Sequence, residues 1–322
     1  MEMEKVPAAG YKIEGLDIAG ISRSNMLKNI SLPLKVLKSV SRAKEIITKF
    51  NPDAIVGVGG YASGPTLWAG IRKHIPTLVQ EQNSYPGVTN KILSKFVRKI
   101  CVAYPGMEKF FPKNKIEVTG NPVRQDITDL ESKYSAASEY FGFKDIGFTV
   151  LVIGGSLGAR TINESIAASL DMLAQNNIRI VWQTGKQYYA QAKELEKKYS
   201  NIRVYDFISK MDYAYAEADV VVSRAGAISL SELCITGLPC ILVPSPNVSE
   251  DHQTKNAMEL VNHNAAIMIK DIDAKAELGN AVVKLASDSR MRASLGENIS
   301  ALAIKDSAAR IAKEVIALTE QK

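Results

Sequence analysis

The chain alternates short runs rich in β-branched residues with longer stretches of helical periodicity, and the alternation recurs in two series. It is typical of α/β folds, in which helices connect the parallel strands of a sheet. The first series predicts strands at 53–58, 76–80, 99–103 and 116–119. The second predicts strands at 148–153, 178–183, 202–205, 218–223, 239–243 and 265–269. Two open sheets of this kind indicate two Rossmann-like domains.

The stretches between the strands predict helices. They are expected at 34–50, 66–73, 89–95, 161–170, 187–199 and 227–236, and from Ala274 to the end of the sequence. A polar, serine-rich helical stretch within 124–147 is interpreted as the crossover between the domains. The stretch 3–22 looks like a loop, whereas a doubly wound domain normally begins with a strand and a glycine-rich turn. We therefore expect an incomplete N-terminal domain.

Simple counts narrow the class of protein. A chain of 322 residues is long enough for two domains. No run approaches the roughly 20 apolar residues of a membrane-spanning helix, and the charged start predicts no signal peptide. The three cysteines, in apolar contexts, predict reduced and buried thiols. The three histidines have no cysteine at ligand spacing, so we expect no metal site.

Charge is unevenly distributed along the chain. Residues 1–123 contain 18 Lys and Arg against 9 Asp and Glu, a net charge of +9, and the whole chain carries +6, so the remainder carries −3. A basic half indicates an anionic partner such as phospholipid or phosphate. Nucleic acid is disfavoured because aromatic residues do not interleave with the basic ones.

The segment 26–50 mixes Leu and Ile with basic residues. These are Lys28, Lys35, Lys38, Arg42, Lys44 and Lys49. One hypothesis is peripheral attachment to an anionic leaflet, where each cation contributes about 1 kcal/mol. The alternative is an ordinary helix with its apolar face in the core and its lysines in water.

The strongest local motif is VLVIGGSLGAR at 150–160, in which a strand runs into small residues and then a helix. Gly154 and Gly155 allow close approach of a ligand, and a helix N-terminus offers free N–H groups to a diphosphate. Ser156 adds a hydroxyl donor. A tight turn without a ligand remains the alternative. The spacing differs from the G-x-G-x-x-G of dehydrogenases, which disfavours a nicotinamide cofactor.

Two further strands end in small-residue turns. In ADVVVSRAGAISLSELCITG, at 218–237, Glu232 lies in the second helical turn, where a carboxylate can accept ribose hydroxyls; a solvated Glu is the alternative. In GVGGYASGP, at 57–65, the glycines precede a helix, and an anion cradle or a flexible turn fits equally.

Two polar segments also follow strands. QEQNSYPGVTN, at 80–90, is rich in amides suited to sugar hydroxyls. PSPNVSEDHQTKN, at 244–256, is expected to be a polar loop that carries His252, Gln253 and Asn256 at the carboxyl edge of the sheet. Either segment could equally be an ordinary polar loop.

Together these motifs resemble the MurG family, the UDP-N-acetylglucosamine–N-acetylmuramyl-(pentapeptide) pyrophosphoryl-undecaprenol N-acetylglucosamine transferases. The resemblance is collinear over nearly the whole chain and includes GVGGYASGP, PGVTNK, VTGNPVR, GGSLGAR, ADVVVSRAGAISLSEL and DHQTKNA. It implies a GT-B fold, with two Rossmann-like domains facing across a cleft. The implied parts are an acceptor- and membrane-facing domain at 1–123, a UDP-GlcNAc-binding domain at 124–305, and a C-terminal helix at 306–322 that returns to the first domain.

The resemblance also implies roles for individual residues. Arg124 and Ser156 would contact the diphosphate, the backbone of Ile208 the uracil and Glu232 the ribose. Gln253, with His252 beside it, would bind sugar hydroxyls, and Asn83 would reach the donor sugar. The turn covering phosphate and sugar would be formed by Ala227, Ile228, Ser229, Leu230, Ser231 and Glu232. Further residues of the acceptor site or cleft would be Gly59, Gly60, Tyr61, Gly154, Gly155 and His252.

The front of the chain departs from the family. The family begins with a strand and the loop GGTGGH, whose histidine is often proposed as the general base, and this sequence has no such segment. We therefore expect an incomplete N-terminal domain and assign no catalytic residue. No D-x-D-type carboxylate pair lies between strands, and we expect neither a metal nor a cofactor.

The implied activity is inverting transfer of GlcNAc from UDP-GlcNAc to the C4 hydroxyl of undecaprenyl-diphospho-MurNAc-pentapeptide, a step of peptidoglycan synthesis that serves cell shape and division. The expected location is peripheral, on the cytoplasmic face of the bacterial inner membrane. Three alternatives stay open: a fragment that only binds UDP-GlcNAc, a UDP-GlcNAc epimerase on a related fold, and a dinucleotide oxidoreductase.

Overall fold

The computed structural model describes residues 2–18, 32–143, 147–155 and 157–320. The chain forms two compact units, which we call unit 1 (Met1–Gly120 and Ala308–Lys322) and unit 2 (Asn121–Ser307). It therefore passes between the units twice. In the described ranges, no helix is both long and apolar enough to cross a membrane.

Unit 1 contains a parallel sheet of four strands in the order β1-β2-β3-β4. The strands are β1 Ile55–Gly57, β2 Thr77–Glu81, β3 Lys99–Val102 and β4 Ile116–Val118. The helices of unit 1 are α1 Glu2–Ala8, α2 Leu32–Phe50, α3 Ser63–Arg72, α4 Val88–Leu93 and α13 Ser307–Glu320, with short 3₁₀ turns at Met107–Lys109 and Lys113–Lys115. All four strands coincide with expected strands to within two residues at each end.

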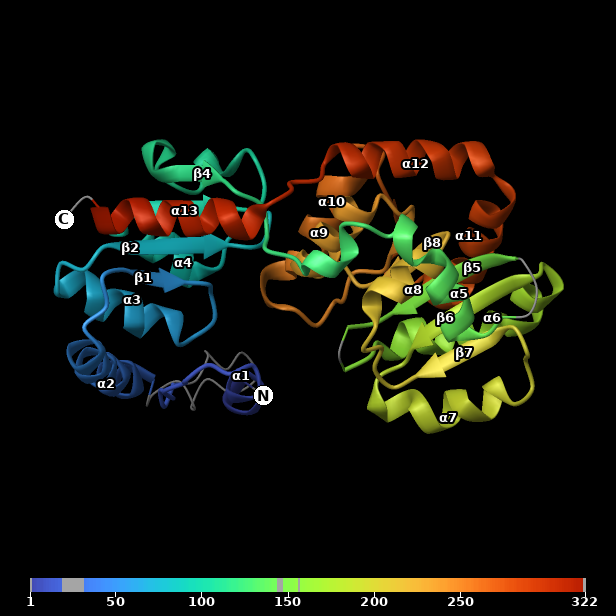
Figure 1. Cartoon of the computed structure of the whole chain (residues 1–322), viewed down its shortest axis with the longest axis horizontal. Helices are drawn as coiled ribbons and strands as arrows, with labels where there is room; N and C mark the ends of the chain where they lie inside the picture. The colour runs from blue at the N-terminus through green and yellow to red at the C-terminus, as the bar shows by residue number, and fades with distance from the viewer. Residues whose placement is uncertain (1, 19–31, 144–146, 156, 321–322) are drawn as a thin grey trace. The chain divides into compact units, whose positions relative to one another are not determined.

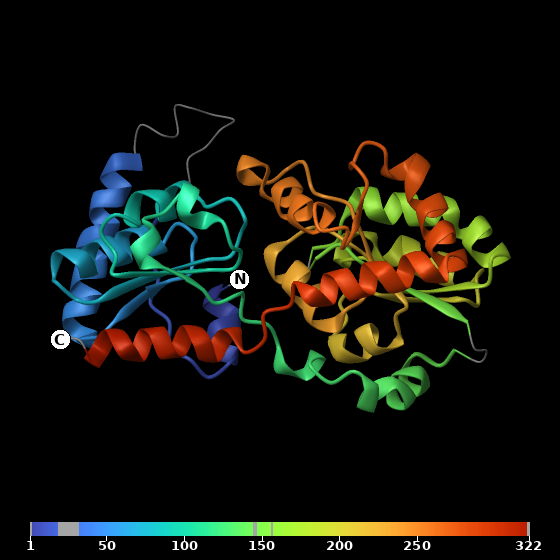
Figure 2. The ribbon, with the colours of Figure 1, turned by 90° about the horizontal axis from the view of Figure 1, so that it is seen from above.

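Both faces of the unit 1 sheet are covered, by helices from different parts of the chain. Val79, Ile100 and Val102 face a core completed by α2, α3 and α4. Leu78 and Cys101, which alternate with them, face Leu318 of α13. Figures 1 and 2 show α13 lying along this face. A helix more than 200 residues later in the sequence thus supplies one layer of unit 1.

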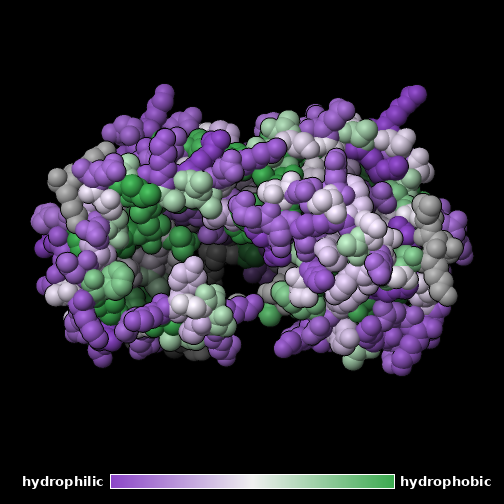
Figure 3. Space-filling model, viewed as in Figure 1, coloured by the Kyte–Doolittle hydropathy of each residue, from purple (hydrophilic) through white to green (hydrophobic). Residues whose placement is uncertain are grey.

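Strand β1 is an edge of the unit 1 sheet and is only partly covered. Val56 is 38% exposed and Val58, just after the strand, is 60% exposed. Figure 3 shows hydrophobic residues at the surface of unit 1 in this region, below α13. An uncovered apolar edge can accept a further strand.

Unit 2 contains a parallel sheet of six strands in the order β10-β9-β8-β5-β6-β7. The strands are β5 Phe148–Ile153, β6 Ile178–Gln183, β7 Ile202–Tyr205, β8 Val220–Ser223, β9 Cys240–Leu242 and β10 Ile267–Met268. The first three have the expected bounds. The α/β class, with two parallel sheets, is therefore confirmed.

Helices cover both faces of the unit 2 sheet. They are α5 Tyr134–Phe141, α6 Arg160–Gln175, α7 Lys186–Glu196, α8 Met211–Glu217, α9 Ala227–Thr236, α10 His252–Val261, α11 Ala274–Ser287 and α12 Ser289–Ala301. Val150, Val152 and Trp182 face a core shared with α6, α7 and α11. Leu151, Ile153 and Val221 face a core shared with α5, α8, α9 and α10. The continuous apolar strands reflect this burial on both sides.

Two segments expected to be loops contain helices. In the opening stretch, α1 begins with Glu2 and Glu4 and has Lys5 in its last turn, an order that complements the helix dipole. In the segment 244–256, α10 begins at His252, because Asn256, Ala257 and Leu260 form a face that is buried in unit 2. The loop expectation was therefore wrong for 3–8 and for 252–256, whereas 9–18 and 244–248 contain neither helix nor strand.

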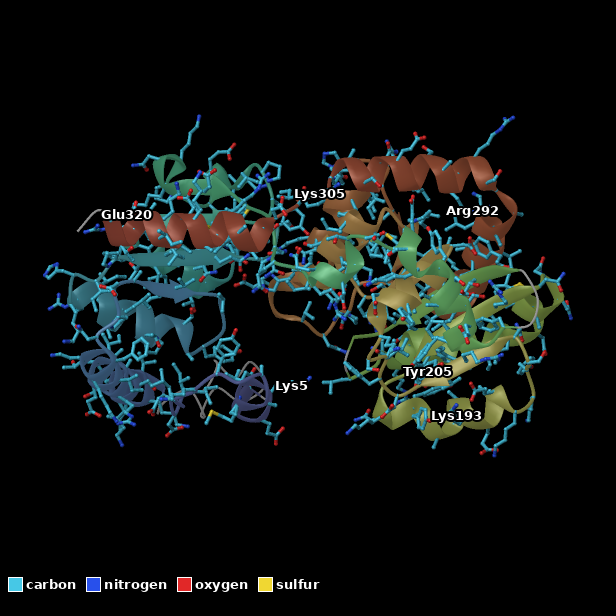
Figure 4. The ribbon with its side chains drawn as sticks, viewed as in Figure 1. Lys5, Lys193, Tyr205, Arg292, Lys305 and Glu320 are labelled. Atoms are coloured by element: carbon cyan, nitrogen blue, oxygen red, sulfur yellow. The ribbon has the colours of Figure 1, made fainter. Side chains whose placement is uncertain are left out.

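The expected crossover and the expected C-terminal helix also differ in detail. Residues 124–147 form two 3₁₀ turns, Gln125–Ile127 and Glu131–Lys133, followed by α5. The tail is three helices. Asp288 leaves helical geometry between α11 and α12, and its side chain caps α12 by accepting from Met291 N at 2.9 Å. The second break lies at 302–306, where Asp306 has a φ of 59° before α13 begins. At this corner Arg292, labelled in Figure 4, donates to Ala286 O at 2.8 Å. Its guanidinium carbon lies 5.0 Å from the centroid of the Phe148 ring.

Candidate functional site

The candidate residues of unit 2 follow the carboxyl ends of its strands. Because all six strands are parallel, the turns after β5, β6, β7, β8 and β9 lie at one edge of the sheet. Ligands of open α/β sheets bind at this edge. The long helices α6 and α9 both begin there, at Arg160 and Ala227, and direct their N-terminal N–H groups toward it.

The turn between β5 and α6 depends on glycine for two separate reasons. Gly155 and Gly158 have φ of +79° and +80°, a region that other residues rarely adopt. A Cβ on Gly158 would lie 2.0 Å from Thr184 O, and a Cβ on Gly154 would lie 2.3 Å from Ala159 N. The turn therefore packs backbone against backbone on the segment after β6. Ser156, expected to contact a diphosphate, lies outside the described residues.

The turn between β8 and α9 is tied to its neighbours through Arg224. Its guanidinium donates to Asp271 Oδ1 and, at 2.9 Å, to Val243 O at the end of β9. Asp271 Oδ2 in turn accepts from Thr161 Oγ1 at 2.9 Å, in the first turn of α6. One carboxylate therefore links the starts of the two helices whose N-termini are candidates for phosphate binding.

Glu232, in the second turn of α9, is almost fully buried, with 7% of the residue exposed. Its Oε1 accepts from Arg124 Nε at 3.0 Å, and its Oε2 accepts from Tyr215 Oη at 2.9 Å. Burial and the negative charge of Glu232 raise the pKa of Tyr215 well above its ordinary value, so this phenol stays a donor. Glu232 is thus an ionic acceptor with two long-range partners, not a solvated helical residue.

The first turns of α9 are fastened to the start of unit 2. Ser231 Oγ donates to Ala227 O at 3.1 Å and accepts from Asn121 Nδ2 at 3.1 Å. Leu230 is fully buried, whereas Ile228 is 37% exposed. Ser229 lies with Ala227 at the beginning of the helix, partly buried. The expected phosphate and sugar turn is therefore a rigid helix start with one exposed apolar residue.

The backbone of Ile208 is already engaged on one side. Its N–H donates to Gln183 Oε1 at 2.8 Å, and Gln183 Nε2 donates to Gly155 O at 3.1 Å. Gln183 therefore fixes the segment after β7 relative to the glycine turn after β5. Because its N–H is engaged in this bond, the backbone group that Ile208 can offer to a uracil ring is its carbonyl.

Gln253 and His252 belong to the first turn of α10. Gln253 Oε1 accepts from Ser245 N at 2.8 Å, and among the described residues none bonds to its Nε2. The chain enters the helix through Glu250 and Asp251, with φ of 54° and 53°. Two successive non-glycine residues in the left-handed region are uncommon, and such geometry gathers at binding sites.

In unit 1 a buried carboxylate orders the expected amide-rich segment. Glu81, at the end of β2, is 3% exposed. Its Oε1 accepts from Asn83 N and Asn83 Nδ2 at 3.0 and 3.2 Å. Its Oε2 accepts from Gly87 N at 3.2 Å and Asn90 Nδ2 at 2.7 Å. The amides thus bind Glu81, which shapes the loop that carries Asn83.

The loop after β1 is open on one side. Gly59 and Gly60 have φ of +88° and +75°, and a Cβ on either would meet no atom of the described chain within 4 Å. Tyr61, next to them, is 59% exposed. The geometry provides backbone N–H groups beside free space, at the N-terminal side of α3.

Comparison with known proteins decides the family. Residues 1–102 match the glycosyltransferase family 28 N-terminal domain, and residues 149–315 match its C-terminal domain. A relative from Parabacteroides distasonis is 52% identical over 100% of this chain and 88% of its own length, and one from Cytophaga hutchinsonii is 53% identical over 98% and 85%. Both are named UDP-N-acetylglucosamine–N-acetylmuramyl-(pentapeptide) pyrophosphoryl-undecaprenol N-acetylglucosamine transferase. The chain belongs to the MurG family.

Solved structures agree with this assignment. MurG of Acinetobacter baumannii superposes with a TM-score of 0.76 at 28% identity, over 98% of this chain and 88% of that one. A UDP-GlcNAc 2-epimerase from Neisseria meningitidis bound to UDP-GlcNAc superposes with a TM-score of 0.63 at 14% identity, over 94% and 84%. At that identity the epimerase shares the fold alone. The GT-B type fold of the MurG family is therefore shown, and the epimerase alternative is not favoured.

The residues that organise the MurG-family site were not all expected. Tyr215, Gln183, Asp271 and Glu81 each bond to an expected residue or its turn. One signal was available: Glu81 and Gln183 are polar residues at the last positions of apolar strands. Tyr215 and Asp271 carried no such signal, because their partners lie on other elements.

Proposed function

We propose that this chain transfers GlcNAc from UDP-GlcNAc to the C4 hydroxyl of undecaprenyl-diphospho-MurNAc-pentapeptide, with inversion at the anomeric carbon. The supporting observation is membership of the MurG family at about 52% identity over the full chain. The strand edge of unit 2 fits this substrate, since two helix N-termini, one arginine and one buried carboxylate gather there.

Within unit 2 each part of the donor has a proposed partner. The diphosphate binds Arg124, Ser156 and the N-terminal N–H groups of α6 and α9, which stabilise the charge that develops on the leaving UDP. Glu232 binds the ribose and the Ile208 backbone binds the uracil. Gln253, beside His252, binds hydroxyls of the sugar.

The bond network supports the assignment of Arg124 and Glu232. Arg124 uses Nε for Glu232, and no residue within the described ranges bonds to its two terminal nitrogens. The side chain of Arg124 is 43% exposed, so these nitrogens can bind a diphosphate while Nε stays on the carboxylate. Ribose and diphosphate recognition are then coupled through one ion pair.

The reaction test uses the purified chain, UDP-GlcNAc and a lipid-linked MurNAc-pentapeptide. We expect release of one UDP for each GlcNAc transferred, with a β-linked disaccharide as product. Calorimetry with UDP-GlcNAc runs in parallel. Binding without transfer would identify a binding-only protein, and absence of both would remove the proposed function.

We also propose that unit 1 attaches to an anionic membrane surface on the cytoplasmic face of the inner membrane. α3 packs between α2 and α4, and Trp68 contacts Phe96 edge to face at 5.4 Å. Exposed apolar residues on these helices, and in the turn that follows α4, include Leu34 (58%), Leu37 (67%), Trp68 (37%), Ile92 (57%) and Phe96 (50%). Lys35, Lys38 and Lys95 accompany them. Apolar residues with basic neighbours are what binding to an anionic leaflet needs.

Vesicle flotation tests the attachment. We expect the chain to float with vesicles containing anionic phospholipid and to float less with zwitterionic vesicles. The double variant Lys35→Glu, Lys38→Glu should lose the difference. The matched control is Lys198→Glu, Lys275→Glu, which changes the net charge equally on exposed positions of unit 2. Equal flotation with both vesicle types would remove the electrostatic part of the proposal.

A further inference from the structure

The hydroxyl of Tyr215 is a buried polar group that contacts Glu232 of the candidate site. Tyr215 lies in α8, is 1% exposed, and is one of the largest fully buried side chains of the described chain. A buried phenol hydroxyl needs a hydrogen-bond partner. Its partner is the carboxylate Oε2 of Glu232, at 2.9 Å.

The orientation of the Glu232 carboxylate is fixed from two sides. The last torsion of a Glu side chain is broad and would leave the carboxylate plane free to rotate. Tyr215 Oη donates to Oε2 and Arg124 Nε donates to Oε1, so rotation would break both bonds. Each oxygen has more than one lone-pair direction, so each can accept a second donor in the same orientation.

We propose that Tyr215 is a positioning residue for nucleotide binding: its buried hydroxyl holds the Glu232 carboxylate in the orientation that accepts the ribose hydroxyls of a uridine nucleotide. This inference rests on the proposed function, because it assigns the ribose to Glu232. Arg124 is partly exposed and is also proposed to bind the diphosphate. Tyr215 is therefore the donor that keeps its place whether or not the nucleotide is bound.

A purely structural role makes a different prediction. The ring of Tyr215 packs with Met211, Leu230 and Leu233 in the core of unit 2. Tyr215→Phe keeps this packing and removes only the hydroxyl. If Tyr215 served packing alone, Tyr215→Phe would change the affinities for UDP and for 2′-deoxy-UDP equally, and only as far as it changed the stability of the chain.

The experiment is calorimetry of UDP and 2′-deoxy-UDP with the full chain and its variants. In Tyr215→Phe we expect the Kd of UDP to rise about tenfold, the effect of weakening a charged hydrogen bond, and that of 2′-deoxy-UDP to rise less than about threefold. The preference for ribose over deoxyribose therefore falls. Tyr213→Phe, on the same helix with its ring against Tyr140, is the matched control and should keep the preference.

A double variant separates the outcomes. If Tyr215 acts through Glu232, then Tyr215→Phe adds no further loss of UDP affinity in a Glu232→Gln background. Additive losses, or equal losses of UDP and 2′-deoxy-UDP in Tyr215→Phe, would overturn the positioning role while UDP binding by the unaltered chain stands. Failure of the unaltered chain to bind UDP would instead overturn the proposed function, and with it this inference.

Discussion

Arg124 Nε and Glu232 Oε1 lie 3.0 Å apart and form an ion pair within unit 2, although 108 residues separate them in the sequence. The arginine is proposed to bind the diphosphate and the carboxylate the ribose. Because they pair with each other, each charged group already has a partner before a ligand binds. Burial of a carboxylate has a desolvation cost, and the bonds from its partners offset that cost.

Neutralising Glu232 tests the ribose assignment. In Glu232→Gln, the amide keeps the shape of the side chain but no longer pairs with Arg124 or accepts equally from two ribose hydroxyls. We expect the KM for UDP-GlcNAc to rise about tenfold or more, consistent with loss of charged hydrogen bonds. Steady-state kinetics against UDP-GlcNAc measures it. Glu164→Gln, at a position of α6 whose side chain is 42% exposed, is the control, and an unchanged KM in Glu232→Gln would contradict the assignment.

The glycine turn after β5 predicts that two alanine variants lose different amounts of stability. Gly155 and Gly158 have nearly the same positive φ, but only Gly158 lacks room: a Cβ there would lie 2.0 Å from Thr184 O. Gly155→Ala should lose about 1 kcal/mol from backbone strain, and Gly158→Ala should lose roughly 2 kcal/mol more from the clash. Chemical denaturation compares the two. Equal losses would mean that the close approach does not constrain the fold.

The ion pair between Lys133 and Asp212 predicts how stability depends on pH. Their atoms lie 2.7 Å apart, at the start of α8. Although burial opposes it, the bond to Lys133 lowers the pKa of Asp212 from the ordinary 3.8. A carboxyl group with a lowered folded-state pKa adds stability above its unfolded pKa, and that stability disappears as pH falls through the folded value.

Asp212→Asn should therefore be less stable than the unaltered chain at pH 7, by roughly 1.5–3 kcal/mol, the range for a hydrogen bond to a charged group. The difference should shrink as pH falls below 3.8. Denaturation midpoints across this range measure it. A constant difference at all pH values would show that the effect is not electrostatic.

The thiols should resist modification while the chain is folded. Burial raises the pKa of Cys101 to about 11 and that of Cys234 to about 12, and it raises the pKa of Cys240 further. All three cysteines are buried and reduced. Since the thiolate is the reactive form, we expect a disulfide reagent at pH 8 to label fewer than one thiol per native chain and three in denaturant. Fast labelling of the native chain would contradict the burial.

The strands could be predicted because their signal is local. Runs such as 148–153 and 178–183 are apolar throughout, and a parallel sheet covered on both faces requires that pattern. The helix α10 was missed because its polar start, His252 to Lys255, resembles a loop. The residues that pack it into unit 2, such as Ala257 and Leu260, come later in the helix. Tertiary packing decided the structure there.

The elements that carry the candidate residues could be predicted, but the partners of those residues could not. A glycine turn between a strand and a helix can be recognised because its residues, such as 150–160, are consecutive in the sequence. The donors of Glu232 lie 17 and 108 residues away, on a different helix and at the start of the unit. No periodicity records such a pairing, so Tyr215 was missed even though Glu232 was expected.

The C-terminal helix has a consequence for synthesis. Leu78 and Cys101 lack their covering helix until Leu318 has been synthesised, and every residue of unit 2, from Asn121 to Ser307, is synthesised before Leu318. The strands of unit 1 are therefore translated before unit 2, but the helix that covers the second face of their sheet is translated after it.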